Sequence, residues 1–69
     1  MGERLANRLK DRRGELALTQ ADLAELVGVS RKTVNTVENG VFVPSALLAL
    51  KLARALEMPV EALFWLSAE

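Results

Sequence analysis

Apolar residues recur at helical spacing along much of this 69-residue chain. Leu23, Leu26 and Val27 stand at positions i, i+3 and i+4, which predicts one apolar face of a short amphipathic helix. Thr19 precedes this face as a candidate N-cap, and Asp22 follows three residues later, as in a capping box. The pattern therefore predicts a helix that begins directly after Thr19.

A second short helix is predicted directly after the first. Gly28 comes where the first helix must end, and glycine adopts the left-handed turn that ends many helices. Ser30 is the next candidate N-cap, and Asn39 with Gly40 is a typical C-terminal signal. Residues 19–40 therefore predict two helices joined by a tight turn.

The second helix carries a polar face that packing does not require. Val34 and Val37 fall together on a helical wheel and should face the core. The opposite arc combines cations with short hydrogen-bonding side chains: Arg31, Lys32, Asn35, Thr36 and Asn39. Such groups can contact DNA phosphates and base edges in the major groove. An ordinary solvated face is the simpler alternative for this helix alone, whereas its combination with a capped partner helix and a glycine turn favours DNA binding.

Three further helices are predicted, over residues 3–13, 46–56 and 60–66. Leu5 and Leu9 share a face of the first, Ser45 caps the next, and Pro59 suits the first position of the last. The expected fold class is therefore all-α, with five helices in one compact domain over residues 1–69. The helices within residues 45–66 should complete its core.

Some apolar residues of the C-terminal half exceed what a small core can cover. Leu47 and Leu50 widen the apolar arc of the helix over 46–56, and Trp65 with Leu66 stands beside the C-terminus. An uncovered apolar group is either a fraying end or a contact surface. A domain of this size also buries only about 60% of its unfolded surface. We therefore expect these four residues to form the contact of a homodimer.

Composition and charge narrow the possible functions. Nine Lys and Arg balance nine Asp and Glu, which argues mildly against nucleic-acid binding, but seven of the nine cations lie between Arg4 and Lys32. Histidine and cysteine are absent, which removes imidazole and thiol catalysis, disulfides and the usual zinc ligands. No apolar run is long enough to span a bilayer. We expect a cytoplasmic protein that is not an enzyme and needs no cofactor, metal, membrane or small-molecule ligand.

Several short motifs of this chain occur together in one known family. They are Thr19-Gln20, Leu23-Ala24, Val27-Gly28-Val29-Ser30, Val34, Val37, Glu38-Asn39-Gly40, Pro44-Ser45 and Val60-Glu61-Ala62-Leu63-Phe64. In this combination the chain resembles the phage repressor and Cro family of helix-turn-helix proteins, the Xre-like regulators. The resemblance covers nearly the whole chain. It implies a lambda-repressor-like domain that binds double-stranded DNA and regulates transcription, as a small homodimeric repressor on a palindromic operator with two half-sites.

The resemblance also assigns roles to individual residues. By analogy Gln20, Ser30 and Asn39 would contact phosphates, Arg31, Lys32 and Thr36 would reach base edges, and Asn35 lies at the border of that surface. Arg13 would form a structural ion pair with Glu38. Arg12 and Val41 depart from the family pattern, which usually has an apolar residue and a cation at these positions.

A second class of function remains open from the sequence. The same scaffold could serve as a protein-interaction module, such as an antitoxin-like or adaptor component. Zero net charge, Val41 and the apolar C-terminus favour that alternative, whereas the polar first turn of the helix after Ser30 favours DNA binding.

Overall fold

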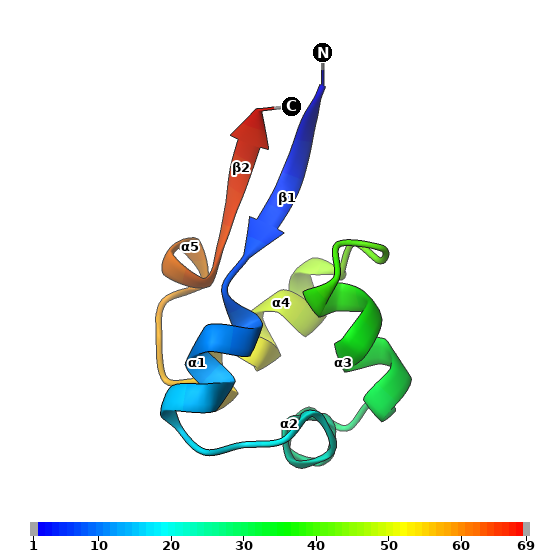
Figure 1. Ribbon diagram of the computed structural model, residues 1–69, viewed down its shortest axis with the longest axis vertical. Helices are drawn as coiled ribbons and strands as arrows, with labels where there is room; N and C mark the ends of the chain where they lie inside the picture. The colour runs from blue at the N-terminus through cyan, green and yellow to red at the C-terminus, as the bar shows by residue number, and fades with distance from the viewer. Residues whose placement is uncertain (1, 69) are drawn as a thin grey trace.

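A computed structural model describes residues 2–68 of the chain, and in this range five helices form a body from which a two-stranded ribbon projects (Figure 1). The helices are α1 (Leu9–Glu15), α2 (Gln20–Val27), α3 (Arg31–Glu38), α4 (Ala46–Ala55) and α5 (Val60–Leu63). The ribbon pairs β1 (Glu3–Asn7) with β2 (Phe64–Ala68). Helix α2 lies at the opposite end of the body from the tip of the ribbon, and α3 runs along one side so that its last turn lies near the base of the ribbon (Figure 1).

The caps that the sequence predicts are present at α2 and α3. The Thr19 hydroxyl accepts from the Asp22 amide at 3.0 Å, and the Asp22 carboxylate accepts from the Thr19 amide at 2.9 Å. Gly28 ends α2 in the left-handed region with φ of 76°. The Ser30 hydroxyl then accepts from the Thr33 amide at 3.1 Å. These local bonds set the sharp change of direction between the two helices.

One apolar cluster joins all five helices. Its fully buried side chains are Leu9, Leu23, Leu52, Leu56, Leu63, Val34 and Val37. Leu26 is an exception to the predicted apolar face of α2, because 61% of it is exposed. The buried residues of α2 are Leu23, Ala24 and Val27.

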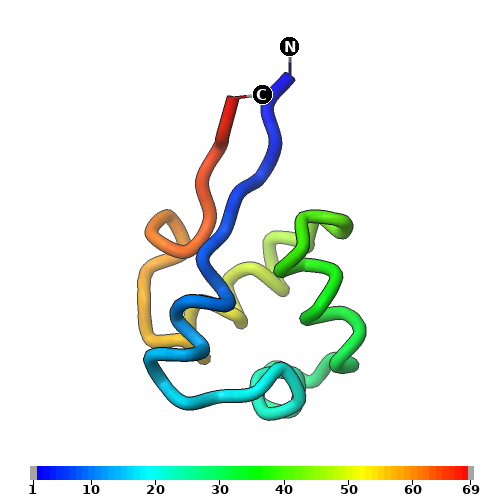
Figure 2. Tube along the Cα trace, viewed as in Figure 1, coloured from blue at the N-terminus to red at the C-terminus, as the bar shows by residue number. Residues whose placement is uncertain are grey.

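The expectation of an all-α fold is wrong at both ends of the chain. Residues 3–7 are a strand rather than the first turns of a helix, and α5 ends at Leu63 instead of continuing to Leu66. The two strands are antiparallel, with Glu3 opposite Ala68 and Asn7 opposite Phe64. Figure 2 shows these end segments running side by side away from the helices. Each strand pairs its backbone N–H and C=O groups with those of the other strand. Local sequence patterns do not reveal this pairing, because the two strands are far apart in the chain.

None of the helices within residues 2–68 has the length and apolar character needed to cross a membrane.

Candidate nucleic-acid interface

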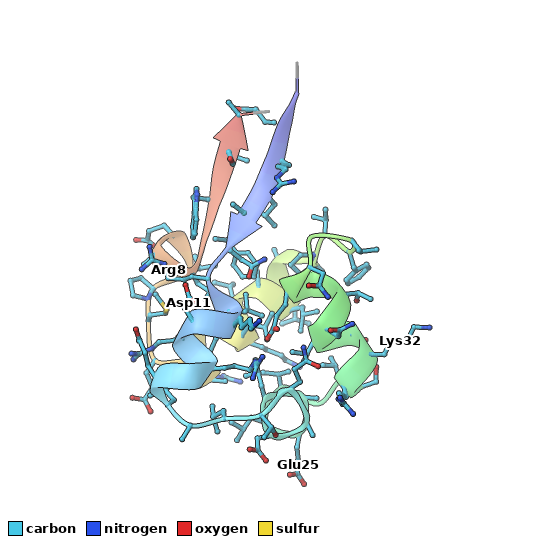
Figure 3. All side chains as sticks on the ribbon, in the orientation of Figure 1. Arg8, Asp11, Glu25 and Lys32 are labelled. Atoms are coloured by element: carbon cyan, nitrogen blue, oxygen red, sulfur yellow. The ribbon has the colours of Figure 1, made fainter. Side chains whose placement is uncertain are left out.

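The first turn of α3 presents its two cations to solvent. Arg31 and Lys32 are both exposed, and Figure 3 shows Lys32 extending away from the body of the molecule. Together with Gln20 of α2 and Asn35 of α3, they line a shallow hollow on the surface. The helix-turn-helix packing therefore brings four of the seven residues expected to contact DNA around one polar depression.

Three side-chain amides form a hydrogen-bonded chain across this surface. The Gln20 amide nitrogen donates to the Asn35 amide oxygen at 3.1 Å. The Asn39 amide nitrogen donates to the same oxygen at 3.2 Å. Because Gln20 begins α2 and the two asparagines lie one turn apart on α3, these bonds fix how the helices present their polar groups.

Two of the expected contact residues already use their hydroxyl groups within the fold. Ser30 caps α3, and its hydroxyl also lies 3.0 Å from that of Thr33. The Thr36 hydroxyl donates to the Thr33 carbonyl at 3.0 Å, and the residue is half-buried. Thr36 is therefore left with its methyl group and an acceptor lone pair, whereas Ser30 lies exposed beside the free amides of the helix N-terminus.

Behind this surface an ion pair joins α1 to the last turn of α3. The Arg13 guanidinium donates through Nε and Nη2 to the two oxygens of Glu38, the second at 3.1 Å. Arg13 also donates to the Leu18 carbonyl at 2.9 Å. The hydrogen bond to Glu38 raises the pKa of Arg13, against the opposing effect of burial. The ion pair that the family resemblance implies between Arg13 and Glu38 is therefore present.

The Glu38 carboxylate connects the ion pair to the exposed amides. Its Oε1 accepts from the Gln20 amide nitrogen at 3.1 Å, in addition to the bond from Arg13. A continuous set of hydrogen bonds therefore runs from Arg13 on α1 through Glu38 and Gln20 to Asn35 on the surface.

Arg12 has a structural role that its departure from the family pattern did not reveal. Its Nε donates to the Leu56 carbonyl at 2.8 Å, and its Nη1 contacts Glu15 at 3.0 Å. Leu56 is the C-cap of α4, where carbonyl groups lack partners within the helix. A cation at this end also interacts favourably with the helix dipole. Arg12 therefore caps α4 from the neighbouring helix.

Asn7 is a further residue that sequence reasoning missed. Its amide nitrogen donates to the Val37 carbonyl at 3.1 Å, and its amide oxygen accepts from the Leu9 amide at 3.0 Å. The side chain therefore links the base of the ribbon to the end of α3 and satisfies a free amide at the start of α1. An asparagine oxygen that accepts from the amide two residues later forms an Asx turn, and the helix expected over residues 3–13 obscured this signal.

The loop after α3 is apolar and exposed. Val41, where a cation is common in the family, is 78% exposed and offers no charge to a phosphate. Its amide donates to the Thr36 carbonyl at 2.9 Å, and with Gly40 in the left-handed region this bond closes the C-terminus of α3. The side chain is therefore held at the surface beside the polar face.

The four apolar residues expected to form a dimer contact do not make one continuous patch. Trp65 lies opposite Ala6 in the ribbon, whereas Leu66 lies opposite Leu5, so the two face opposite sides. The Arg8 guanidinium stands 5.4 Å from the centre of the Trp65 ring. Leu47 and Leu50 form an exposed stripe on α4. Trp65 and Leu66 therefore cannot share one flat face of the ribbon, and the homodimer contact itself stays a prediction.

Leu66 borders a groove between the ribbon and the loop after α3. The groove has a volume of about 570 Å³, and its apolar lining includes Leu5, Phe42, Val43 and Phe64. Phe42 is 48% exposed and Val43 is 68% exposed. The side of the ribbon that carries Leu66 therefore has the larger share of uncovered apolar surface.

The sequence of this chain is similar to those of known helix-turn-helix proteins. A family model described as helix-turn-helix matches residues 9–63. The chain is 45% identical over 65 residues to the HTH-type transcriptional regulator YgzD of Bacillus subtilis (strain 168), covering 94% of this chain and 98% of that one.

Two solved structures share the fold with substantial sequence identity. The restriction-modification controller protein C.AhdI from Aeromonas hydrophila aligns with a TM-score of 0.74 and 37% identity, over 78% of this chain and 82% of its own. The P22 c2 repressor protein, solved in complex with a synthetic operator, aligns with a TM-score of 0.75 and 31% identity, over the same shares of the two chains, 78% and 82%.

Proposed function

This chain belongs to the phage-repressor and Cro-like helix-turn-helix family and is a sequence-specific DNA-binding transcriptional regulator, and from that premise we propose how it engages its operator. The first turn of α3 enters the major groove of double-stranded DNA. The observation that carries this docking is the hollow bordered by Gln20, Arg31, Lys32 and Asn35, where exposed polar groups of both helices converge.

The residues of this surface divide between phosphates and bases. Arg31 and Lys32 are exposed at the helix end that reaches base edges in this motif, so they are the main candidates for direct readout. Gln20, Ser30 and Asn39 flank them and would contact the sugar-phosphate backbone. Thr36 offers a methyl group to a thymine. Asn35 lies between these sets.

The protein acts as a homodimeric repressor on an operator with two-fold symmetry. One copy places only a few side chains on DNA, and two half-sites about 34 Å apart are needed to engage two recognition helices at once. The exposed apolar residues of the groove beside α3, Phe42, Val43 and Leu66, suit such a contact, because a two-fold interface uses the same patch on each copy. The name of the P22 c2 protein as a repressor supports the direction of regulation.

The dimer contact that we favour uses Leu66 with the exposed Phe42 and Val43 of the groove, rather than Trp65. Leu47 and Leu50 form a separate exposed stripe on α4. Leu66 is 65% exposed and lies on the groove side of the ribbon with Phe42 and Val43. Trp65 is 41% exposed and partly covered by Arg8. Burial of Leu66 with Phe42 and Val43 removes more apolar surface from water than burial of Trp65 does. It also keeps the contact close to α3.

A mobility-shift titration tests DNA binding directly. Mixed genomic fragments at two salt concentrations should show binding that weakens as salt rises, because phosphate contacts release counterions. Selection from a random library should then return a motif with two inverted half-sites. A protein that binds no DNA at the lower salt would contradict the proposed docking and favour a protein-interaction role. An asymmetric selected site would contradict the dimer alone.

A further inference from the structure

We propose that Asn35 determines base specificity. Its amide oxygen is occupied within the protein, so that only its amide nitrogen can bond DNA, and the side chain selects a base edge with hydrogen-bond acceptors, guanine above all. The inference deepens the proposed function and rests on the docking of α3 in the major groove. It states that Asn35 donates a hydrogen bond to a base and does not accept one. This direction follows from the hydrogen bonds that link Arg13, Glu38, Gln20 and Asn35.

The first step is that Glu38 can only accept hydrogen bonds. Arg13 is a permanent cation, and it donates to both oxygens of the Glu38 carboxylate. The side chain of Glu38 is 5% exposed, and an ionised carboxylate with so little solvent is stable because of this partner. Any further group that bonds Glu38 must therefore be a donor.

The second step fixes the orientation of the Gln20 amide. Its nitrogen lies 3.1 Å from Glu38 Oε1, and the reversed amide would place two oxygens in contact. The same nitrogen lies 3.1 Å from the Asn35 side chain. Because this nitrogen carries only hydrogens to donate, Asn35 must present its amide oxygen to Gln20.

The third step saturates that oxygen. Asn39 donates to it at 3.2 Å, so the Asn35 oxygen accepts from two donors, one for each of its lone pairs. The Asn35 amide nitrogen makes no hydrogen bond with the residues described in the structure, and Asn35 itself is exposed. The group left for DNA is therefore an NH₂.

The base preference follows from the chemistry of the major groove. Asparagine usually reads adenine with both atoms, its oxygen accepting from N6 and its nitrogen donating to N7. Here the oxygen is occupied, which removes half of that arrangement. Guanine offers two adjacent acceptors, N7 and O6, to a lone donor, whereas cytosine offers a donor and is disfavoured.

Two experiments test the inference. In the free protein labelled with ¹⁵N, the side-chain NH₂ protons of Asn35 should exchange with water faster than those of Gln20. This measurement needs no DNA and shows directly which of the two side-chain amide nitrogens is hydrogen-bonded within the protein. Slower exchange at Asn35 than at Gln20 would overturn the proposal even if the protein binds DNA as proposed.

Binding-site selection with wild type and Asn35→Asp tests the readout. The variant keeps an oxygen for Gln20 and Asn39 but turns an acceptor toward the bases. At one position in each half-site, we expect the preference to move from guanine toward cytosine, with about a tenfold loss on the original site. Arg54→Ala, on the exposed surface of α4, serves as the control and should select the wild-type motif.

The outcomes separate this inference from the proposed docking. A wild-type preference for adenine at the position that Asn35→Asp changes would overturn the inference and leave the docking intact. Loss of affinity by Asn35→Asp that is equal on all sequences would also overturn it, since Asn35 would then contact a phosphate. A wild-type protein that binds no DNA contradicts both.

Discussion

Trp65 and Leu66 are neighbours in sequence but project from opposite faces of the ribbon, one toward Arg8 and the other into the groove beside the loop after α3. This alternation divides the apolar C-terminus into two surfaces of different composition. It also makes the proposed dimer contact testable by substitutions at adjacent positions.

We expect Leu66→Ser to weaken the homodimer and Trp65→Ser to leave it largely unchanged. Leu66 would lose apolar burial against the second copy, about 1.5–3 kcal/mol for a fully buried leucine. Sedimentation at micromolar concentrations gives the proportion of dimer, and circular dichroism controls for folding. The opposite order, with only Trp65→Ser dissociating, would place the interface on the Arg8 side. A wild-type monomer would refute both contacts.

The Arg13–Glu38 pair should behave as a coupled unit in unfolding experiments. The two side chains are 13% and 5% exposed, so removal of one partner leaves a charge that is poorly solvated. We expect Glu38→Leu to lower the free energy of unfolding by about 3 kcal/mol. The double variant with Arg13→Met should recover part of this loss, as measured by urea denaturation. Additive losses would show that the two side chains are energetically independent.

Arg31 should contribute to specific binding. If it contacts a guanine edge, Arg31→Ala should cost about 1–3 kcal/mol on the selected operator and less on unrelated DNA. Fluorescence anisotropy with both DNAs measures the difference. Arg54→Ala removes the same charge from the exposed surface of α4 and should cost little on either DNA. An equal loss on both DNAs would make Arg31 a phosphate contact.

Stability should fall in acid partly through the cap of α2. The hydrogen bond from the Thr19 amide, with a smaller contribution from its hydroxyl, lowers the pKa of Asp22 below its usual value of 3.8. Protonation is therefore more favourable in the unfolded chain, and the stabilising contribution of Asp22 is present above pH 3.8 and lost as the pH falls through the lower folded value.

Asp22→Asn provides the test of this linkage. The difference in unfolding free energy between wild type and variant should be largest near neutral pH and should shrink below the usual pKa of the carboxyl. Denaturation curves at neutral and strongly acidic pH measure it. A difference that stays constant with pH would mean that the charge of Asp22 does not stabilise the cap.

The sequence predicts the helix-turn-helix well because its signals are local. Thr19, Gly28 and Ser30 each act on amides within a few residues, and Val34 with Val37 marks the buried face of α3 at helical spacing. The resemblance adds the pairing of Arg13 with Glu38, which no local pattern contains.

The ribbon could not be predicted by the same reasoning. Leu5 and Leu9 have the i, i+4 spacing of a helix, yet Leu5 pairs with Leu66 at the other end of the chain. A strand this short is decided by its partner rather than by its own residues. The amide network likewise depends on Gln20 and Asn35 meeting across two helices, and their hydrogen-bond polarity follows only from the geometry of Glu38.

The pairing of β1 with β2 has a consequence for the order of events during protein synthesis. Glu3 pairs with Ala68, so the ribbon can close only after residue 68 has left the ribosome. Contacts between distant residues carry a large loop-closure cost, which falls once the helices have formed and the Arg8 amide bonds the Leu63 carbonyl at 3.1 Å. A nascent chain would therefore hold a folded helix-turn-helix unit while β1 and β2 are still unpaired, and the fluorescence of Trp65 would report their pairing.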